Sequence, residues 1–359
     1  MAKKSENNIE TTGVDLNFFD VYNQPYRMNY DIIDGKNGKN TYVNWGVDNK
    51  LPDFIWQQYL KCSDLQALVN TTVDYIVGND IVIEKPDYCL GSDMTVEDIV
   101  RRCIMDYILF GGFAVSCVRN NAGDRIVRVK YQNVMNVRVN EDLTMGYLSS
   151  NWSNWTTKNI IKIPLYNKDE AQPQFLLYFR GNLTRNINPI AIWQSGLKSV
   201  EVLNNTRLYN LRNIQNNFAS NVIIALNGAT IKSKELDEIK KKISAGYEGA
   251  ENAGKTLLIN NSNSEGKVEV TRLDSDKAAN IYNDIQNSSI EDLYGAFRIN
   301  KVLVGKNINT GFSRVEYQDI YAIYKATVIE PLRRQIKRVF KEINIGVAFD
   351  DLKIEWSEN

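Results

Sequence analysis

The sequence contains no histidine among its 359 residues. Without an imidazole, it cannot build a Ser-His or Cys-His nucleophile pair, a histidine acid or base, or a His-containing zinc site. The chain also has no net charge, because its 43 Lys and Arg residues balance its 43 Asp and Glu residues. A protein that coats nucleic acid by neutralising phosphates over its whole surface would be basic overall, so the balance argues against that class.

Cysteine is scarce, and its spacing carries no known chemistry. The four cysteines lie 27, 14 and 14 residues apart, and no CxxC pair occurs. A zinc ribbon and a redox motif are therefore excluded, and we expect free buried thiols in a reducing compartment. The four are Cys62, Cys89, Cys103 and Cys117.

Long apolar runs are absent. The longest run, over residues 104–118, is interrupted by Asp106 and by the pair Gly111-Gly112, so it is too short to span a bilayer. The N-terminal segment MAKKSENNIETTG has no apolar stretch behind its lysines and therefore does not resemble a signal peptide. We expect no membrane contact and a location inside a cell.

The composition is otherwise that of a folded protein. Hydrophobic residues make up 43% of the chain, enough for a large core, and the length suggests two or three structural units. Residues 1–50 are the exception, since they are polar, rich in asparagine and without periodicity. They predict an extended N-terminal arm.

Apolar residues at spacings of three and four predict three helices after this arm. A proline marks the first turn of the first helix, a glycine ends the second, and a capping box begins the third. The first helix is expected to start at Leu51, the second to cover 65–76 before Gly78, and the third to run from Thr95 to Gly111.

Alternating apolar residues then predict an antiparallel sheet, so the first half is of the α+β class. Two segments near the C-terminus alternate in the same way and are expected to close this sheet. The strands are predicted at 113–118, 126–129, 134–139, 160–164 and 175–179, and the closing segments at 347–349 and 352–356.

Three long helices dominate the second half. They are predicted at 189–218, 275–297 and 314–343, and Pro331 should kink the third. Between the first two lies a small αβ insert. It consists of strands at 222–226, 256–259 and 268–273 and a charged helix at 232–244.

The insert contains a sequence that matches the nucleotide-binding P-loop pattern GxxxxGK[ST]. Gly249 to Thr256 satisfy it letter for letter. A working P-loop follows a buried strand and precedes a helix whose N-terminus binds phosphate. Here a charged segment precedes the motif and the strand-like Leu257-Leu-Ile259 follows it, so a turn between helix and strand is the favoured interpretation.

The order of these elements resembles the portal proteins of tailed bacteriophages. The similarity covers Leu51 to Ile343, and the ordered set of motifs carries it, since each alone is weak. Asn300 stands where the family usually has proline. The matching segments are Ala67–Ile76, Tyr107–Val115, Asn216–Ile223, Gly249–Ile259, Gly295–Gly305 and Val328–Leu332.

The resemblance implies a portal fold made of named parts. A wing of helices and antiparallel sheet would carry two long stem helices, a small αβ clip and a long Pro-kinked wing helix, with little or no crown. Its implied parts are the arm 1–50, wing 51–191, stem helix 192–218, clip 219–274, stem helix 275–297, tunnel loop 298–312 and second wing part 313–359.

The family function implied is a ring, typically of twelve subunits, at one vertex of the capsid. DNA would be packaged through this ring by terminase and later ejected through it, and the ring would attach the tail. The implied partners are further copies of the chain, double-stranded DNA, the terminase large subunit, the major capsid protein and a head-to-tail connector. Assembly would take place in the host cytoplasm, and the final location would be the virion.

The resemblance also implies roles for three groups of side chains. An acidic channel wall would make no contact with phosphate, so duplex DNA could slide past it. Lysines of the tunnel loop would contact phosphates transiently. A basic helix of the clip would bind terminase and the connector. The wall residues are Asp276, Asp284, Glu291 and Asp292; the loop residues are Lys301, Lys306, Asn307 and Asn309; the clip residues are Lys232, Lys234, Lys240, Lys241 and Lys242.

Each group also has an ordinary explanation as a solvated surface. The same holds for the basic end of the third long helix, because its dipole favours each C-terminal cation by roughly 0.3–1 kcal/mol. Any remaining charge there would pair with a neighbouring subunit or face DNA. The cations are Arg333, Arg334, Lys337, Arg338 and Lys341.

Two alternatives to a portal stay open on the sequence alone. One is a P-loop enzyme, and the other is a different structural component of a virion, such as an adaptor or a capsid-associated protein. We expect a protein that is not an enzyme, with no catalytic residue, cofactor or metal.

Overall fold

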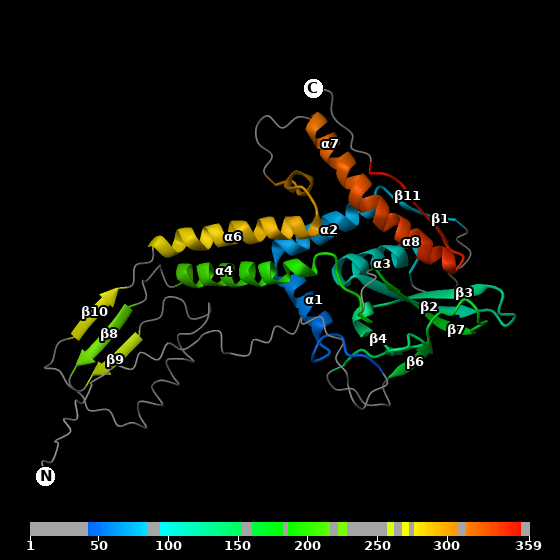
Figure 1. The fold of residues 1–359 in the computed structure, drawn as a ribbon, viewed down its shortest axis with the longest axis horizontal. Coiled ribbons are helices and arrows are strands. Elements are labelled where there is room, and N and C mark those ends of the chain that lie inside the picture. The colour runs from blue at the N-terminus through cyan, green and yellow to red at the C-terminus, as the bar shows by residue number, and fades with distance from the viewer. Residues whose placement is uncertain are drawn as a thin grey trace, which may run out of the picture.

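The computed structural model describes residues 42–84, 94–152, 160–181, 186–215, 222–227, 257–261, 268–272, 276–306 and 314–352. Figure 1 shows helices α1–α3 at the centre and sheets beside them. An antiparallel pair of long helices extends away from this part and ends near a further small sheet.

The segment before the first helix is irregular but buried. Trp45 is 2% exposed, and the fully buried Arg138 donates hydrogen bonds to the Asn49 carbonyl at 3.0 Å and to the Val137 carbonyl at 2.7 Å. The guanidinium carbon of Arg138 lies 5.5 Å from the Trp45 ring centroid and 4.9 Å from that of Trp152. The predicted arm therefore does not extend to residue 50, because Tyr42, Val43, Trp45 and Asn49 are buried against the folded part; residues 1–41 lie outside the described residues.

The three predicted helices are confirmed. Helix α1 covers Leu51–Lys61, α2 covers Ser63–Val77 and α3 covers Val96–Phe110. The capping box of α3 forms as expected, with the Thr95 hydroxyl accepting from the Asp98 amide. Gly78 ends α2 at φ +73°, and a Cβ there would lie 1.8 Å from the Asp350 carbonyl oxygen, so only glycine fits.

The central sheet has the strand order β3-β2-β7 and is antiparallel throughout. Its alternating side chains divide between two layers, as the period of two requires. Phe113 and Val115 join the helical core, whereas Ala114 faces a second sheet. The strands are β2 Gly112–Arg119, β3 Ile126–Gln132 and β7 Gln174–Arg180.

The second sheet, in the order β4-β5-β6, covers the other face of the central one. A bridge between Leu165 and Leu176 joins the two sheets. The strand predicted over 134–139 is only half correct, since Val134–Asn136 form a 3-10 turn. The strands are β4 Val137–Val139, β5 Met145–Leu148, which the sequence did not predict, and β6 Ile161–Pro164.

The C-terminal strand does not close the wing sheet as predicted. Strand β11 (Gly346–Phe349) instead pairs antiparallel with β1 (Ile81–Glu84) in a separate two-stranded sheet. Asp350 and the Gly78 turn lie against each other at its end, which fixes this pairing. Residues 351–352 are not in a strand, and the remainder of the predicted strand 352–356 lies outside the described residues.

The two long helices are α4 (Leu197–Gln215) and α6 (Asp276–Phe297), which run antiparallel side by side (Figure 1). Helix α4 starts later than predicted. The preceding chain contains a 3-10 turn, Gln194–Gly196, and the Trp193 indole donates to the Ile108 carbonyl at 3.0 Å. Ala191 and Trp193 thus belong to the core, and the helix begins only after them.

A mixed sheet stands at the outer end of this pair (Figure 1). Its order is β10-β8-β9, with β8 antiparallel to β10 and parallel to β9. The strands are β8 Val222–Asn227, β9 Leu257–Asn261 and β10 Val268–Arg272.

The third long helix is interrupted. Helix α7 (Arg314–Tyr324) passes through a π-helical turn, Lys325–Ile329, into α8 (Glu330–Glu342). Pro331 follows this turn and cannot donate to the Thr327 carbonyl, which instead accepts a hydrogen bond from Arg298 at 3.2 Å. A kink at Pro331 stays a prediction; the π-helical turn is what the structure shows.

Asp106 is a buried carboxyl in the helical core. It is 5% exposed and accepts hydrogen bonds from the Tyr131 hydroxyl at 2.9 Å and the Val134 amide at 3.2 Å. Burial raises the pKa of Asp106 to about 7, although both hydrogen bonds oppose the rise. The core is therefore more stable at a pH where this carboxyl is protonated.

We predict that Asp106→Asn stabilises the protein above neutral pH. In the unfolded chain the carboxyl ionises near its ordinary pKa of 3.8, so the burial penalty appears as pH rises from about 4 and is complete above about 7. Asparagine retains an oxygen acceptor and has no penalty. We expect a gain on the order of 2 kcal/mol at pH 8 and almost none at pH 4, measured by denaturant unfolding.

The matched control is Asp142→Asn, which neutralises an exposed carboxyl. It should leave the pH profile of unfolding unchanged. A profile for Asp106→Asn that runs parallel to the wild type would contradict the prediction.

Candidate functional site

The base of the helix pair is locked by packing against the core. The rings of Trp193 and Phe297 stack at 5.9 Å between centroids and 7° between planes. Gly196 lets α6 approach closely, because a Cβ there would lie 3.1 Å from Leu293 Cδ1. Further out, the Tyr209 and Tyr282 rings meet at 4.4 Å. The two helices are thus joined along their described length.

Asp64, in the first turn of α2, joins this pair to the segment that follows it. Its carboxylate is 5% exposed and forms ion pairs with Arg207 of α4 and with Lys306. One buried charge is therefore compensated by two cations from residues 143 and 242 positions away in the sequence.

The ionisation of Asp64 follows from these contacts. Burial opposes the charge, but the hydrogen bonds and charges of Lys306 and Arg207 outweigh it and hold the pKa of Asp64 below its ordinary value. Tyr294 lies nearby on α6, and burial raises its pKa. The site is thus an ionised carboxylate with two cations at the base of both long helices.

The segment after α6 is more ordered than the loop predicted at 298–312. Lys301–Val304 form a 3-10 helix, and Asn300 caps it by accepting from the Val302 amide at 3.0 Å. Residues 307–313, with Asn307 and Asn309, lie outside the described residues.

Both predicted loop lysines make ion pairs within the chain. Lys306 pairs with Asp64, and Lys301 pairs with Glu291 of α6. The negative charge of Glu291 on α6 is therefore compensated by Lys301.

The acidic side chains of α6 lie on its exposed surface. Asp284 and Glu291 are seven residues apart and share one helix face, and Asp292 accepts a hydrogen bond from Ser199 of α4 at 3.5 Å. The backbone of Asp276 begins the helix. The predicted wall residues thus belong to one helix, with Glu291 neutralised.

The clip lysines 232, 234, 240, 241 and 242 and the P-loop-like motif at 249–256 lie outside the described residues. The chain directly after that motif is nevertheless informative. It forms β9 from Leu257 and runs parallel to β8. A P-loop requires a helix at this point, so the P-loop interpretation is wrong.

Arg333 differs from the other cations of its helix. It is 2% exposed and donates to the Ile76 carbonyl at 2.8 Å and to the Asp351 carboxylate at 2.8 Å. It belongs to the core. The roles of Asp64, Arg207 and Arg333 left no pattern in the sequence, because their partners are distant along the chain.

No group of three or more potential metal-ligating side chains occurs among the described residues. Within the same residues, no helix is long and apolar enough to cross a bilayer. The described Cys62, Cys103 and Cys117 are buried and free, as predicted.

Comparison with known proteins finds solved structures with a similar fold. The chain resembles a protein in the neck of a native gene transfer agent (GTA) particle computed with C12 symmetry, with TM-score 0.55, 10% identity, and coverage of 83% of this chain and 84% of that chain. A chain of the native gene transfer agent virion matches with the same score and identity, covering 83% of both chains. These likenesses show a shared fold.

A HK97 family phage portal protein from Corynebacterium diphtheriae is also similar, with TM-score 0.49, 12% identity, and coverage of 82% of this chain and 94% of that chain. No curated protein matches the sequence.

The family model described as "Phage portal protein" matches residues 88–357, about three quarters of the chain. The chain belongs to the phage portal protein family. This is a family of structural proteins and not of enzymes.

We predict that Asp64→Asn destabilises the protein because Arg207 and Lys306 lose their charged partner. The expected cost is about 1–3 kcal/mol at pH 7, measured by denaturant unfolding. Since the folded pKa is lowered, this difference should be complete at pH 5 and shrink as pH falls below the ordinary value of 3.8.

Asp74→Asn is the control, since it breaks the exposed pair of Asp74 and Arg101 in the same helix. We expect it to cost at most about 0.5 kcal/mol. Equal effects of the two substitutions would show that the Asp64 contacts add nothing beyond a surface pair.

Proposed function

We propose that this chain is the portal subunit of a tailed phage-like particle and forms a ring around a DNA channel at one capsid vertex. Family membership supports the portal assignment. The observation that carries the ring is the antiparallel pair of α4 and α6, which projects from the body and exposes apolar side chains. The C12 symmetry of the neck that contains a similar chain supports twelve subunits.

The exposed apolar residues lie where no other described residue covers the pair. Leu211 is 49% exposed, Ile214 58% and Ile285 40%. Exposure of several large apolar side chains along two neighbouring helices is typical of an association surface. In the proposed ring, adjacent copies cover them, and α4 and α6 act as the stem helices.

The channel wall is proposed to be the polar face of α6. Asp284, Glu291 and Asp292 are exposed, and repetition around a ring would present a row that repels phosphate. Lys301 pairs with Glu291, so the wall changes from acidic toward neutral at its inner end. DNA would pass such a wall without being held.

The other parts keep the functions that the family implies. We propose that 298–312 is the tunnel loop and that 219–274 is the clip, whose lysines 232–242 meet the terminase large subunit and later the connector. The remaining chain would form the wing against the major capsid protein. Channel, docking and virion location all follow from the portal assignment.

The ring is tested by imaging and mass photometry of the purified full chain. We expect a ring with an axial channel as wide as a DNA duplex. The double variant Leu211→Asp, Ile214→Asp should shift the chain to monomers, because it places charges in the proposed subunit contact.

The matched control is Leu60→Asp, Ile161→Asp, which changes the same residue types at 58% and 62% exposure on other elements. It should leave the ring intact. A wild-type chain that stays monomeric at micromolar concentration would count against the portal function, and equal effects of both variants would remove the α4–α6 surface from the interface.

The loop lysines are tested by Lys301→Gln with Lys306→Gln. Glutamine removes the cations without placing new charge beside Glu291 and Asp64. We expect rings to form, because Arg207 still compensates Asp64, and a severalfold loss of packaged DNA per assembled particle, because the loop loses its phosphate contacts. Lys50→Gln with Lys61→Gln is the control; packaging equal to that control would exclude these lysines from DNA contact.

A further inference from the structure

The outer face of α8 carries a group of four cations. Arg334, Lys337, Arg338 and Lys341 are all exposed, and their spacing of three, four and seven residues places them on one side of the helix. At a rise of 1.5 Å per residue, the row extends about 10 Å. We call these four residues the α8 basic row.

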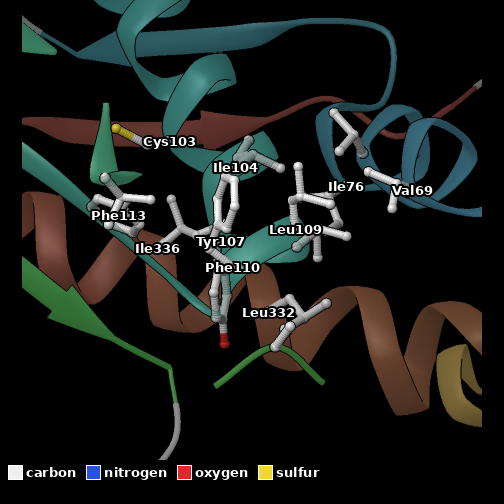
Figure 2. Packing of buried hydrophobic residues seen from close by; sticks show 14 of the residues in the cluster. Val69, Ile76, Cys103, Ile104, Tyr107, Leu109, Phe110, Phe113, Leu332 and Ile336 are labelled. Carbon is white, nitrogen blue, oxygen red and sulfur yellow. The ribbon is translucent and has the colours of Figure 1, made fainter. Parts of the chain in front are cut away.

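The opposite face of α8 is anchored in the core. Figure 2 shows Leu332 and Ile336 in the same cluster of buried residues as Tyr107 and Phe113. Phe340 stacks on Phe113 at 5.7 Å, and the Tyr107 hydroxyl donates to Gln335 at 2.6 Å. Because the opposite face holds α8 in place, the backbone cannot shift to move the four cations of the α8 basic row further apart.

The described part of the chain supplies no ion-pair partner to this row. Among the described residues, none of its four members forms an ion pair, whereas the adjacent Arg333 has two carboxylate partners. Lys337 has one weaker contact, its Nζ lying 5.6 Å from the Phe349 ring centroid. Like charges at these spacings destabilise a helix by roughly 0.2–0.5 kcal/mol per pair.

The helix dipole accounts for only part of the row. Its effect falls off within the last turn, and α8 ends at Glu342. Arg338 and Lys341 fall near that turn, but Arg334 lies two turns from the end. An external anion bound along the row would compensate all four charges, including that of Arg334.

The surface around the row fits phosphate better than a protein. Among the described residues, the large apolar side chains that are exposed include none from α8. Protein interfaces usually have an apolar or aromatic centre and little lysine. Arginine and lysine are side chains that commonly contact DNA phosphates, and a row of about 10 Å is long enough to contact more than one phosphate of a strand.

We propose that the α8 basic row binds the phosphate backbone of duplex DNA without sequence preference. The site is separate from the channel elements, since α8 is neither of the helices of the pair nor part of the loop after α6. It gives the chain a surface that holds DNA, in contrast to a wall past which DNA slides. The inference does not depend on which helix lines the ring.

The test uses the full chain and a 30-base-pair duplex of mixed sequence in fluorescence anisotropy titrations. The variant replaces all four residues of the row by glutamine. We expect at least roughly tenfold weaker binding at low salt. Because log K falls by about 0.9 per log unit of salt for each phosphate contact, the slope should become shallower by about 2 to 4.

The control replaces Lys61, Arg125, Arg128 and Lys168 by glutamine. These residues are exposed, lie on other elements and remove the same charge. If both variants weaken DNA binding and flatten the salt dependence equally, the effect is one of net charge, and the proposed site is wrong.

Mass photometry of each variant separates this inference from the proposed ring. Unchanged DNA binding with loss of assembly would identify the row as a subunit contact. Unchanged DNA binding with loss of poly-L-glutamate binding would identify a surface for an acidic protein. Either result overturns the proposal, whereas a wild-type chain that binds DNA through the row but forms no ring would contradict only the portal ring.

Discussion

The buried carboxylate of Asp64 connects α2 to α4 and to the segment that follows α6. It binds Arg207 of α4 and Lys306 beyond α6, so one charge in α2 fixes three segments. Neither cation is deeply buried, which keeps their desolvation cost low, while the carboxylate is almost fully covered. Removal of the carboxylate would leave two cations without a partner at the base of the helix pair.

Helix α2 is fixed at its other end by an arginine. Arg333 donates to the carbonyls of Ile76 and Tyr75, which the end of a helix leaves without internal partners, and to Asp351. Helix α2 is thus bound to α4 through the Asp64 carboxylate and to α8 through the Arg333 guanidinium. Strand β11 follows α8 and pairs with β1 directly after α2. Distant parts of the chain converge on α2.

The fold determines which charged residues are paired and which are exposed. The sequence is neutral in sum, but the structure neutralises some charges and leaves others exposed. Glu291 and both loop lysines are paired, Arg333 is buried, and the α8 basic row has no ion pair among the described residues. In the proposed portal, this arrangement separates a passage that does not retain DNA from a surface that does.

Local pattern determined much of this protein. The periodicity that predicted α1–α3, the capping box at Thr95 and the alternation of β2 and β7 depend on neighbours in the sequence, and all three are confirmed. The order of elements was enough to recognise the portal family, and the absence of histidine excluded the chemistry of an imidazole. The strand-like Leu257-Leu-Ile259 also predicted correctly that the P-loop pattern was accidental.

Tertiary structure alone decided what each charged residue does. The pairing of Asp64 with Lys306, the packing of Arg138 against Trp45 and the pairing of β1 with β11 join residues more than 80 positions apart. No local spacing encodes such contacts, because the energy of an ion pair or a strand ladder depends on distance in space. The sequence therefore determined the elements and the family, and only the fold decided which charges are compensated inside the chain and which remain for a partner.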